Sequence, residues 1–524
     1  MSSKKINRRD FIRLSSLASA SLPIALSGYP LFANEKPANL NFDADNDNVL
    51  VLVQLQGGND GLNTLFDLNQ YDNLQNVRSN IIIPENQLLS INADTGFHPS
   101  MTGMQGVWEK EKLSIIQNVG YPNQNRSHFR STDIWHTASD ADEFIATGWL
   151  GRYFSLQNDQ FPTGYPNDDH PHPFAITIGK IVSETCQGTN ANFSMALTDP
   201  ENPGTASVFD NTNLPNNCYG DALQFVDDIA KQTNAYASVI TNAAAQGNSL
   251  STKYTDSDLS EKLKNVARLI AGGLKTKVYI VQLGGFDTHD SQVIDGNNSV
   301  GIHANLLQEL SDAIAAFQED LELLNINNRV VGMTYSEFGR RIRSNGALGT
   351  DHGTAAPMFL FGDCVNNKIL GDAPEIDTQV DQFEGVPMQF DFRDVYRTII
   401  TDWLGGTVTD ANTVLFRSFN ALDVFKDGCN AALSTNTFNT PELDLKVYPN
   451  PASNFLNIEF AGYNRNVKIT LFNSLGAVMR TITNKNYSST KHTIQIDISG
   501  LSTGNYFVHY QSNGISKTKK LIKY

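Results

Sequence analysis

Residues 49–61 read Val-Leu-Val-Leu-Val-Gln-Leu-Gln-Gly-Gly-Asn-Asp-Gly. A continuous apolar run that stops at glycine predicts a strand buried on both faces, as in a parallel sheet covered by helices. Two later runs, 278–283 and 330–335, end at polar residues in the same way. Parallel strands deliver the residues that follow them to the carboxyl edge of the sheet, where open α/β folds bind ligands. We therefore expect the functional site at that edge.

Strand-like and helical patterns alternate along the chain. The further apolar runs are 113–119, 174–178 and 358–361. Apolar residues at helical spacing occur from Leu223 onwards, over 259–274 and over 303–324. This alternation predicts an α/β fold, a mostly parallel sheet covered by helices on both faces. Residues 158–217 are rich in Pro, Asn, Asp and Gly, which is typical of long surface loops or a cap around the site.

The period changes to two near the carboxyl terminus. Alternating apolar residues are Leu456, Ile458, Phe460, Val467, Ile469, Leu471, Ile494, Ile496, Ile498, Tyr506, Val508 and Tyr510. Such short strands, separated by polar turns, predict a small antiparallel β-sandwich. We expect four parts: an export signal at 1–33, the α/β domain at 45–430, a linker at 431–441 and the sandwich at 442–524.

The amino terminus has the features of an export signal. Arg8-Arg9-Asp10-Phe11 precedes the apolar stretch 14–26, and the paired arginines resemble a twin-arginine signal. The stretch is too short and too rich in serine for a lasting membrane span, so we expect no transmembrane segment in the mature protein.

Composition excludes some partners and constrains the cysteines. The formal net charge of the 524 residues is −16, and a surface so acidic repels the phosphate backbone of nucleic acids. Four cysteines in an exported protein suggest disulfides, and Cys186 with Cys218 and Cys364 with Cys429 would close the shortest loops. No Cys-x-x-Cys pair is present, so a zinc site made of thiols is not expected.

Carboxylates and imidazoles follow several of the predicted strands. Asp60, Asp287, His289 and Glu337 come after the runs 49–55, 278–283 and 330–335, and Asp351 and His352 come before the run 358–361. An oxygen-rich set of this kind favours Ca²⁺ or Mg²⁺, whereas the histidines suit Zn²⁺ or Mn²⁺, so we expect a divalent metal of open identity. The alternatives are an Asx turn at Asp60, a salt bridge from Glu337 to Arg340 or Arg341, and an exposed or capping role for His303.

A candidate nucleophile lies after the apolar run 113–119. Ser127 is expected at the amino-terminal end of a helix, where backbone N–H groups favour an anion, and Arg126 or Arg130 would add positive charge. Ser127 is also a common helix cap, and His128 beside it would act as a base or merely pack. The chain has no Gly-x-Ser-x-Gly motif, so the serine site of an α/β-hydrolase is not indicated.

The motifs resemble a known family. They are Gln56 to Thr64, Arg126 to Phe129, Gly284 to His289, Ser336 to Arg340, Gly349 to Gly353 and Phe392 to Tyr396 with Trp403 to Gly405. In this order they resemble the domain-of-unknown-function 1501 family over about residues 45–425. That family is grouped with the alkaline-phosphatase-like and sulfatase-like superfamily, which implies the fold above, metal binding at the acidic and histidine positions, and Ser127 near the nucleophile. Phe338 stands where the superfamily has a histidine, which implies a single, changed or absent metal.

A second resemblance concerns the predicted sandwich. Val447 to Ala452, Leu471 to Gly476 and Ile498 to Tyr506 resemble the C-terminal sorting domain of the type IX secretion system of Bacteroidetes. The resemblance implies a type IX secretion machinery as partner. It also implies transit through the periplasm and a final place in the medium or on the surface of a Bacteroidetes-type cell.

Together these features predict a secreted metal-dependent hydrolase of phosphate or sulfate esters, acting on a small-molecule or glycan ester. A catalytically inactive surface binding protein that keeps the fold is the alternative. A structural partner in an outer-membrane polysaccharide apparatus is a weaker one.

Overall fold

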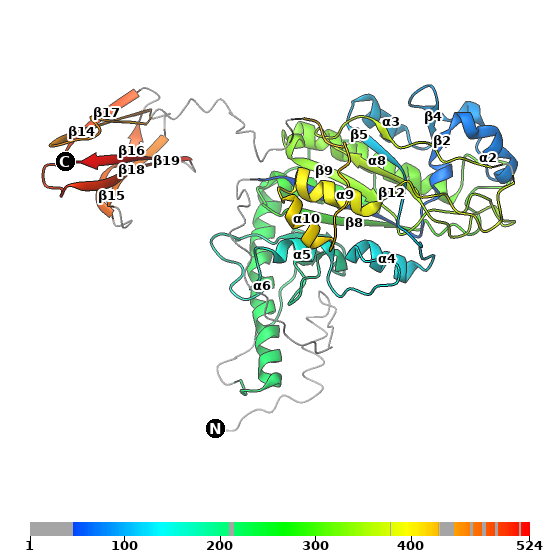
Figure 1. The fold of residues 1–524 in the computed structure, drawn as a ribbon, viewed down its shortest axis with the longest axis horizontal. Coiled ribbons are helices and arrows are strands. Elements are labelled where there is room, and N and C mark those ends of the chain that lie inside the picture. Colours follow the sequence, from blue (N-terminus) through cyan, green and yellow to red (C-terminus); the bar gives the residue numbers. More distant parts are fainter. Residues whose placement is uncertain are drawn as a thin grey trace. The chain divides into compact units, whose positions relative to one another are not determined.

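The computed structural model describes residues 46–208, 214–377, 379–427, 429, 445–461, 465–473, 478–487, 491–512 and 515–524. The chain divides into two compact units, Met1–Ser434 and Thr435–Tyr524 (Figure 1). The predicted export signal at 1–33 and the linker at 431–441 lie outside the described residues. Within the described ranges, no helix combines the length and the apolar character that a membrane crossing requires.

A nine-stranded sheet forms the centre of the larger unit. The path runs through β11 (Ile369–Leu370), β5 (Leu113–Gly120), β10 (Ala356–Phe361), β9 (Val330–Tyr335), β1 (Val49–Gln56), β8 (Val278–Gly284), β6 (Ala175–Ile178) and β7 (Ser194–Leu197), and β12 (Phe390–Asp391) pairs with β5. β1 is parallel to both β8 and β9, whereas β10 is antiparallel to β9 and β5. The predicted mostly parallel sheet is confirmed.

Alternate residues of the central strand enter two different cores. Leu50 and Leu52 of β1 belong to one hydrophobic cluster, and Val51 and Val53 belong to the other. The first core receives α4 (His128–Thr137), α5 (Trp149–Ser155), α9 (Phe392–Thr398), the π-helix η6 (Ile399–Trp403) and α10 (Val408–Val414). The second receives α3 (Thr102–Glu109), α6 (Cys218–Gln246), α7 (Asp258–Ala271) and α8 (Ile302–Leu323). Helices therefore cover both faces, as the continuous apolar run of β1 predicts.

A small satellite packs beside the main sheet. It contains α2 (Tyr71–Arg78) and a sheet of β2 (Leu65–Asp67), β4 (Thr95–Phe97) and β3 (Leu89–Ser90). Short 3₁₀ helices occupy the connections: η1 (Gly61–Asn63), η2 (Leu68–Gln70), η3 (Glu85–Gln87), η4 (Glu184–Cys186) and η5 (Asn327–Arg329). The satellite matters for the site because α2 ends at Arg78, which is buried.

Two expectations differ from the structure. The segment 158–217 is not only loop around the predicted run 174–178, because it also supplies β7 to the sheet edge. His303 is neither exposed nor a cap: α8 begins at Ile302, His303 is 1% exposed, and its Nε2 lies 3.0 Å from Asn59 Oδ1. The start of α8 faces the loop after β1, which sequence periodicity alone does not reveal.

The smaller unit consists of two antiparallel sheets. One contains β13 (Lys446–Tyr448), β14 (Phe455–Ala461) and β17 (Lys491–Asp497), and the other contains β16 (Val478–Tyr487), β15 (Arg465–Asn473), β18 (Gly504–Ser512) and β19 (Ile515–Lys523). Leu456 and Ile458 of β14 and Val467, Ile469 and Leu471 of β15 are buried in a shared core. The predicted period of two is confirmed.

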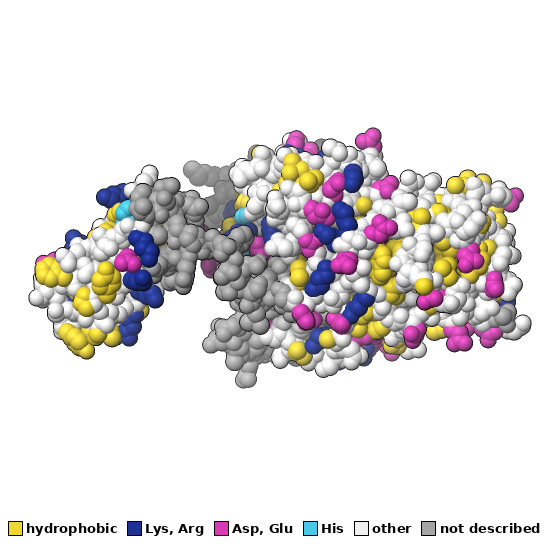
Figure 2. All heavy atoms as spheres, turned by 90° about the horizontal axis from the view of Figure 1, so that it is seen from above, with side chains coloured by type: hydrophobic (Ala, Val, Ile, Leu, Met, Phe, Trp, Pro, Cys, Tyr) yellow, Lys and Arg dark blue, Asp and Glu magenta, His cyan; other side chains and the backbone are white. Residues whose placement is uncertain are grey.

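Charges are distributed differently in the two units. On the face shown in Figure 2, the larger unit mixes acidic and basic side chains, whereas Lys and Arg outnumber acidic side chains on the smaller unit. The visible face of the larger unit therefore has no field of a single sign that would attract a polyanion.

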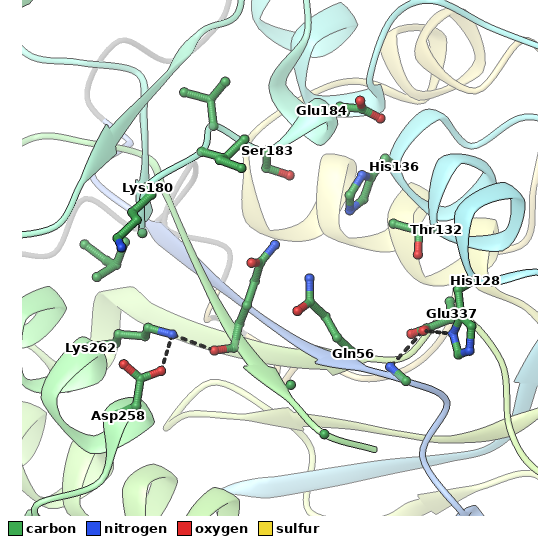
Figure 3. A pocket seen from close by; sticks show the side chains of 18 of the residues that line it. Gln56, His128, Thr132, His136, Lys180, Ser183, Glu184, Asp258, Lys262 and Glu337 are labelled. Carbon is green, nitrogen blue, oxygen red and sulfur yellow. Dashed lines mark hydrogen bonds and ion pairs between the residues drawn. The ribbon is translucent and has the colours of Figure 1, made fainter. Parts of the chain in front are cut away.

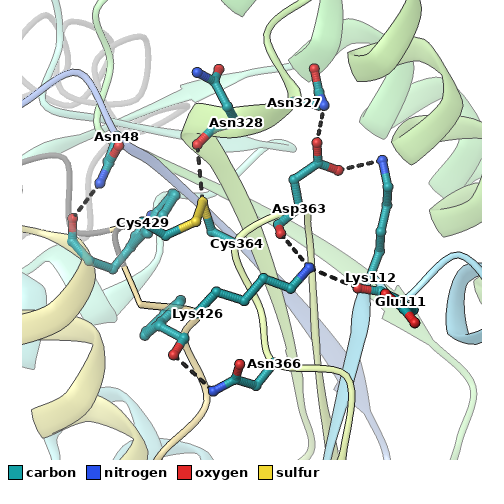
Figure 4. Close-up of a disulfide and its surroundings, with 12 residues drawn as sticks. Asn48, Glu111, Lys112, Asn327, Asn328, Asp363, Cys364, Asn366, Lys426 and Cys429 are labelled. Atoms are coloured by element: carbon teal, nitrogen blue, oxygen red, sulfur yellow. Dashed lines mark hydrogen bonds and ion pairs between the residues drawn. A yellow bond between two sulfur atoms is a disulfide. The ribbon is translucent and has the colours of Figure 1, made fainter. Parts of the chain in front are cut away.

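One of the two expected disulfides is present. Cys364 and Cys429 are bonded, with a Cα–Cα distance of 5.5 Å (Figure 4). Beside them, Lys426 Nζ donates to the carbonyl oxygens of Asp363 at 2.9 Å and Glu111 at 3.1 Å. The other expected pair is wrong, because Cys186 is a free, buried thiol of the core and Cys218 is a free, exposed thiol at the start of α6.

Candidate functional site

The loops after β1, β8 and β9 meet at the carboxyl edge of the sheet through close backbone packing. Gly57 has φ +122°, and a Cβ atom there would lie 2.3 Å from the backbone nitrogen of Asp287. Gly58 has φ +84°, and its Cβ would lie 2.4 Å from the ring of Phe338. At both positions a side chain is disfavoured by the positive φ and by the short contact of its Cβ atom. The glycine pair that ends the first apolar run therefore allows the three loops to converge.

Asp287 lies at the centre of the converging side chains. Its Oδ1 lies 2.7 Å from Arg340 Nη2, 2.8 Å from His289 Nδ1 and 3.1 Å from His352 Nε2. Its Oδ2 lies 3.4 Å from His128 Nε2. Burial raises the pKa of Asp287, but Arg340 and the neighbouring imidazoles outweigh burial and lower it to about 2. Asp287 is thus an ionised carboxylate within reach of three histidines.

Two of these imidazoles are oriented by acceptors on their far side. His352 Nδ1 lies 2.8 Å from the carbonyl oxygen of Arg126, and His128 Nδ1 lies 2.9 Å from Glu337 Oε1. A carbonyl or carboxylate oxygen only accepts, so each Nδ1 carries the proton and each Nε2 presents a lone pair in the neutral ring. The bond to Glu337 raises the pKa of His128, whereas burial lowers the pKa of His352.

The resulting donor set fits a divalent metal. Ligand atoms of His128, Asp287 and His352 all lie within 4.8 Å of one another, and they form the one such group found among the described residues. The two Nε2 atoms approach different oxygens of the Asp287 carboxylate, His352 at 3.1 Å from Oδ1 and His128 at 3.4 Å from Oδ2, so the three side chains surround a space in which a single ion could be held. An acceptor behind each imidazole is the usual outer support of a metal ligand. A metal ion bound here would take the place of the proton that an imidazole otherwise needs at Nε2 to face a carboxylate.

The other expected ligands divide into two groups. His289 joins the cluster, its ring 4.6 Å from that of His352, and Glu337 orients His128 while also accepting from the backbone N–H of Gly57 at 2.8 Å. Asp60 and Asp351 do not join it. They were expected as metal ligands, but the structure gives both of them arginine partners.

Asp60 lies in a buried ion pair. Its two oxygens lie 2.9 and 2.8 Å from Arg78 Nη1, Gln292 Nε2 donates to it at 2.7 Å, and both charged side chains are 0% exposed. Asp351 pairs with Arg341 at 2.9 Å and accepts from Asn345 at 3.1 Å. Asp60 and Asp351 therefore face arginine and amide groups and lie outside the group formed by His128, Asp287 and His352.

Arg340 connects the three loops rather than pairing with Glu337. Its buried guanidinium donates to the carbonyl oxygens of Gly58 at 2.7 Å, Thr350 at 2.7 Å and Phe286 at 2.9 Å, in addition to Asp287. The expected salt bridge from Glu337 to Arg340 or Arg341 is not formed, because Arg340 is committed to Asp287 and Arg341 to Asp351.

Ser127, the expected nucleophile, and the side chains of the two arginines expected beside it form their hydrogen bonds outside the cluster around Asp287. Ser127 precedes α4 as its N-cap, is exposed and makes no side-chain capping bond. Arg130 pairs with Asp133 and donates to the carbonyl oxygen of Asp140 at 2.8 Å. Arg126 donates to the carbonyl oxygen of Phe383 at 2.9 Å. Neither arginine is directed at the cluster, so the expected stabilisation of an oxyanion by Arg126 or Arg130 has no support in their contacts.

His128 is the residue that the sequence reasoning undervalued. Phe338 implied the loss of one imidazole, but the His128 and His352 rings lie 4.4 Å apart, and the Phe338 ring packs against both, at 5.0 and 4.6 Å. An imidazole is thus supplied from α4 instead of from position 338. The signal available in the sequence was the neighbouring Arg126-Ser127-His128-Phe129 motif after β5.

A cleft of about 1180 Å³ opens onto the cluster (Figure 3). Its lining includes His128, Asp287 and Glu337, together with Thr132 on the next turn of α4. Ser127 is not among the lining residues. The cluster is therefore accessible to a ligand from the side of α4 that carries Thr132.

The chain is similar to several solved structures. They include a protein in the alkaline phosphatase superfamily from Vibrio parahaemolyticus (7% identity, 89% of this chain and 82% of that chain covered, TM-score 0.31), the PsFucS1 sulfatase from Pseudoalteromonas sp. (11%, 88% and 83%, 0.29) and a phosphonate monoester hydrolase from Silicibacter pomeroyi (10%, 91% and 88%, 0.30). None of the curated proteins matches the chain. At such low identities and TM-scores, these similarities assign no function.

The family comparisons cover both units. Residues 446–524 match the secretion system C-terminal sorting domain, which indicates export to the cell surface or the medium. Residues 47–400 match the family described as "Protein of unknown function (DUF1501)", in agreement with the motifs at the sheet edge. The chain therefore belongs to the DUF1501 family and carries a C-terminal sorting domain.

Proposed function

We propose that this protein is a secreted metal-dependent hydrolase of phosphate or sulfate esters. The observation that carries the proposal is the arrangement of His128 and His352, whose Nε2 atoms face the Asp287 carboxylate at 3.4 and 3.1 Å while both Nδ1 atoms are engaged elsewhere. His128 and Asp287 line a cleft, which favours a metal that contacts a bound ligand. A buried structural metal would have no such access.

Each residue of the cluster has a distinct task in the proposed reaction. His128, Asp287 and His352 would hold the metal, which supplies positive charge at the ester oxygens when bound. Glu337 and the Arg126 carbonyl orient the two imidazoles, and Arg340 keeps Asp287 ionised. His289 is 44% exposed, and its Nδ1 contacts Asp287, so its Nε2 is free to move a proton at the ester or at a water.

The nucleophile is Ser127, Thr132 or a water molecule, and two substitutions separate them. Thr132 lines the cleft, whereas Ser127 lies one residue before His128 and outside the lining. Loss of turnover in Ser127→Ala alone would assign the serine, and loss in Thr132→Ala alone would assign the threonine. Near-normal turnover in both variants would assign water.

Elemental analysis and ester turnover test the proposal together. We expect the mature protein, loaded in turn with Zn²⁺, Mn²⁺, Mg²⁺ and Ca²⁺, to retain a metal and to hydrolyse 4-nitrophenyl phosphate or 4-nitrophenyl sulfate. His352→Ala and His128→Ala should lose both properties, and His509→Ala in the smaller unit is the matched control. Equal metal content in His352→Ala and the wild type would refute the proposed site.

A surface binding protein without turnover is the second candidate. It is favoured by Phe338, whose ring lies against both imidazoles and occupies space beside the cluster. Retained metal with no turnover of either ester, in every metal-loaded form, would select this candidate over the hydrolase.

The route of export is also part of the proposal. We infer that a twin-arginine signal carries the chain into the periplasm and that a type IX machinery then recognises residues 446–524. Deletion of residues 446–524 should leave the protein in the periplasmic fraction of its cell, whereas Arg8→Lys with Arg9→Lys should leave it in the cytoplasm.

A further inference from the structure

The cleft extends well beyond the cluster. Lys180 and Lys262 lie at one end of it, and His128 and Glu337 lie at the other (Figure 3). Its volume of about 1180 Å³ exceeds the roughly 300–1,000 Å³ of ordinary small-molecule sites. The far end is built from the loop after β6 and from α7. An ester group alone fills only a small part of this space, so the rest is available to the group that carries the ester.

Two large apolar side chains of the cleft are exposed to solvent. Phe129 on α4 is 91% exposed, and Ile181 in the loop after β6 is 73% exposed. Exposed apolar side chains that share a concave surface indicate a ligand contact more strongly than isolated ones do. Phe129 immediately follows His128, so this contact lies next to the proposed metal site.

The polar lining is rich in acceptors and poor in cations. Six carboxylates line the cleft against two lysines, and no arginine is among the described lining residues. Lys262 is committed to Asp258, at 2.5 Å, and to the carbonyl oxygen of Gln282, at 2.8 Å, and two further lining carboxylates, Asp133 and Asp287, pair with arginines outside the lining. Neutral amides and hydroxyls complete the lining: Gln56, Thr132, Ser183, Thr198, Asn265 and Gln282. A ligand with many anionic groups would need several free arginines or lysines and would be repelled here.

We propose that the cleft binds a carbohydrate chain that carries the ester, with Phe129 and Ile181 against the C–H faces of its sugar rings. Sugar hydroxyls donate to the carboxylates and amides of the lining, and the apolar ring faces bury the exposed aromatic and aliphatic side chains. The scarcity of uncommitted cations in the described lining selects chains with few esters over heavily sulfated ones. This inference deepens the proposed function, on which its assignment of the ester-bearing substrate rests.

Binding to a glycan array tests the inference without requiring turnover. The array holds neutral hexasaccharides of glucose, xylose and mannose, singly sulfated and singly phosphorylated forms of each, and a heparin hexasaccharide as the polyanion. The full mature protein and Phe129→Ala, Ile181→Ala and Phe455→Ala variants are compared, with hits quantified by calorimetry. Phe455 is the matched control, because it is 53% exposed but lies in the smaller unit.

We expect the wild type to bind neutral or singly esterified chains and to bind heparin weakest. Removal of the Phe129 ring should weaken binding roughly tenfold, the effect of losing one buried aromatic contact, and Phe455→Ala should have no effect. A silent array, heparin as the strongest ligand, or unchanged binding by both Phe129→Ala and Ile181→Ala would overturn the inference. Glycan binding without ester turnover would instead overturn the proposed function and leave the carbohydrate site standing.

Discussion

Replacing Asp60 by asparagine should destabilise the larger unit without affecting its metal. Asp60 and Arg78 are both 0% exposed, with Oδ2 and Nη1 2.8 Å apart. Arg78 also donates to the carbonyl oxygen of Ile342 at 2.6 Å, so it is held in place when its partner is removed. The substitution therefore leaves a guanidinium charge that is buried and not neutralised.

The expected loss of unfolding free energy is about 3–5 kcal/mol, the cost of breaking a buried pair from one side. Burial raises the pKa of Asp60, but Arg78, His303 and Gln292 outweigh burial and lower it, which agrees with a carboxylate that is ionised in the fold. For an m-value near 3 kcal/mol/M, this loss moves the urea midpoint down by roughly 1–1.7 M.

Tryptophan fluorescence measures the change in the right unit. All four tryptophans, Trp108, Trp135, Trp149 and Trp403, belong to the larger unit, so the smaller unit does not contribute to the signal. Urea unfolding of the full mature protein, followed by tryptophan fluorescence, therefore reports the unfolding of the larger unit directly.

Asp351→Asn is the matched control. Asp351 was expected as a ligand on the same grounds as Asp60, but its pair with Arg341 is partly exposed, with side chains 35% and 21% accessible. An exposed pair contributes about 0–1 kcal/mol, so its urea midpoint should barely move. A stable Asp60→Asn variant that has lost its metal would refute the reasoning, because Asp60 would then be a ligand and not a structural partner of Arg78.

Three further outcomes are expected. Burial lowers the pKa of His303 to about 4, so the unfolded chain takes up a proton at higher pH than the folded chain does, and the free energy of unfolding should fall by about 3 kcal/mol as the pH drops from 6.5 to 4. Unfolding followed by fluorescence across this range should show a weaker dependence of stability on pH in His303→Gln. An identical dependence in the variant and the wild type would contradict a buried, neutral His303. Reducing the Cys364–Cys429 disulfide, or replacing both cysteines by alanine, should lower the free energy of unfolding by about 4 kcal/mol for a separation of 65 residues. The urea midpoint should fall accordingly, and an unchanged midpoint would show that the disulfide does not stabilise the fold. Gly57→Ala should lower the free energy of unfolding by about 1–3 kcal/mol and bind less metal, because φ at Gly57 is +122° and the new Cβ would meet the loop after β8. The Cβ of Gly106→Ala in α3 would meet nothing within 4 Å, so this variant should be neutral or stabilising. Equal metal binding by the two variants would contradict this account.

Much of the fold was predictable because burial leaves a periodic record in a sequence. The runs that became β1, β8 and β9 are apolar on both faces, and the strands of the smaller unit alternate. β6 was visible as the apolar run 174–178, whereas β7 was hidden because a four-residue edge strand in a segment rich in proline and asparagine carries too little pattern.

The site was predictable in position but not in membership. Asp287, His289 and Glu337 follow parallel strands, His352 precedes the antiparallel strand β10, and the structure brings all four together at one edge. Asp60 satisfies the same rule, yet Arg78 from α2 neutralises it. His128 was weighed only as a base or a packing residue, because nothing in its motif shows that its ring turns toward Asp287.

The sequence by itself determined the order of strands and helices, the change to an antiparallel unit near the carboxyl terminus and the edge of the sheet at which the polar residues gather. Only the tertiary structure decided which carboxylates face arginine without an imidazole, as Asp60 and Asp351 do, and which also face imidazoles, as Asp287 does. The reason is physical: periodicity is a property of neighbours along the chain, whereas the contact of His352 with the Arg126 carbonyl joins residues 226 positions apart. Such contacts depend on how loops pack after the sheet has formed.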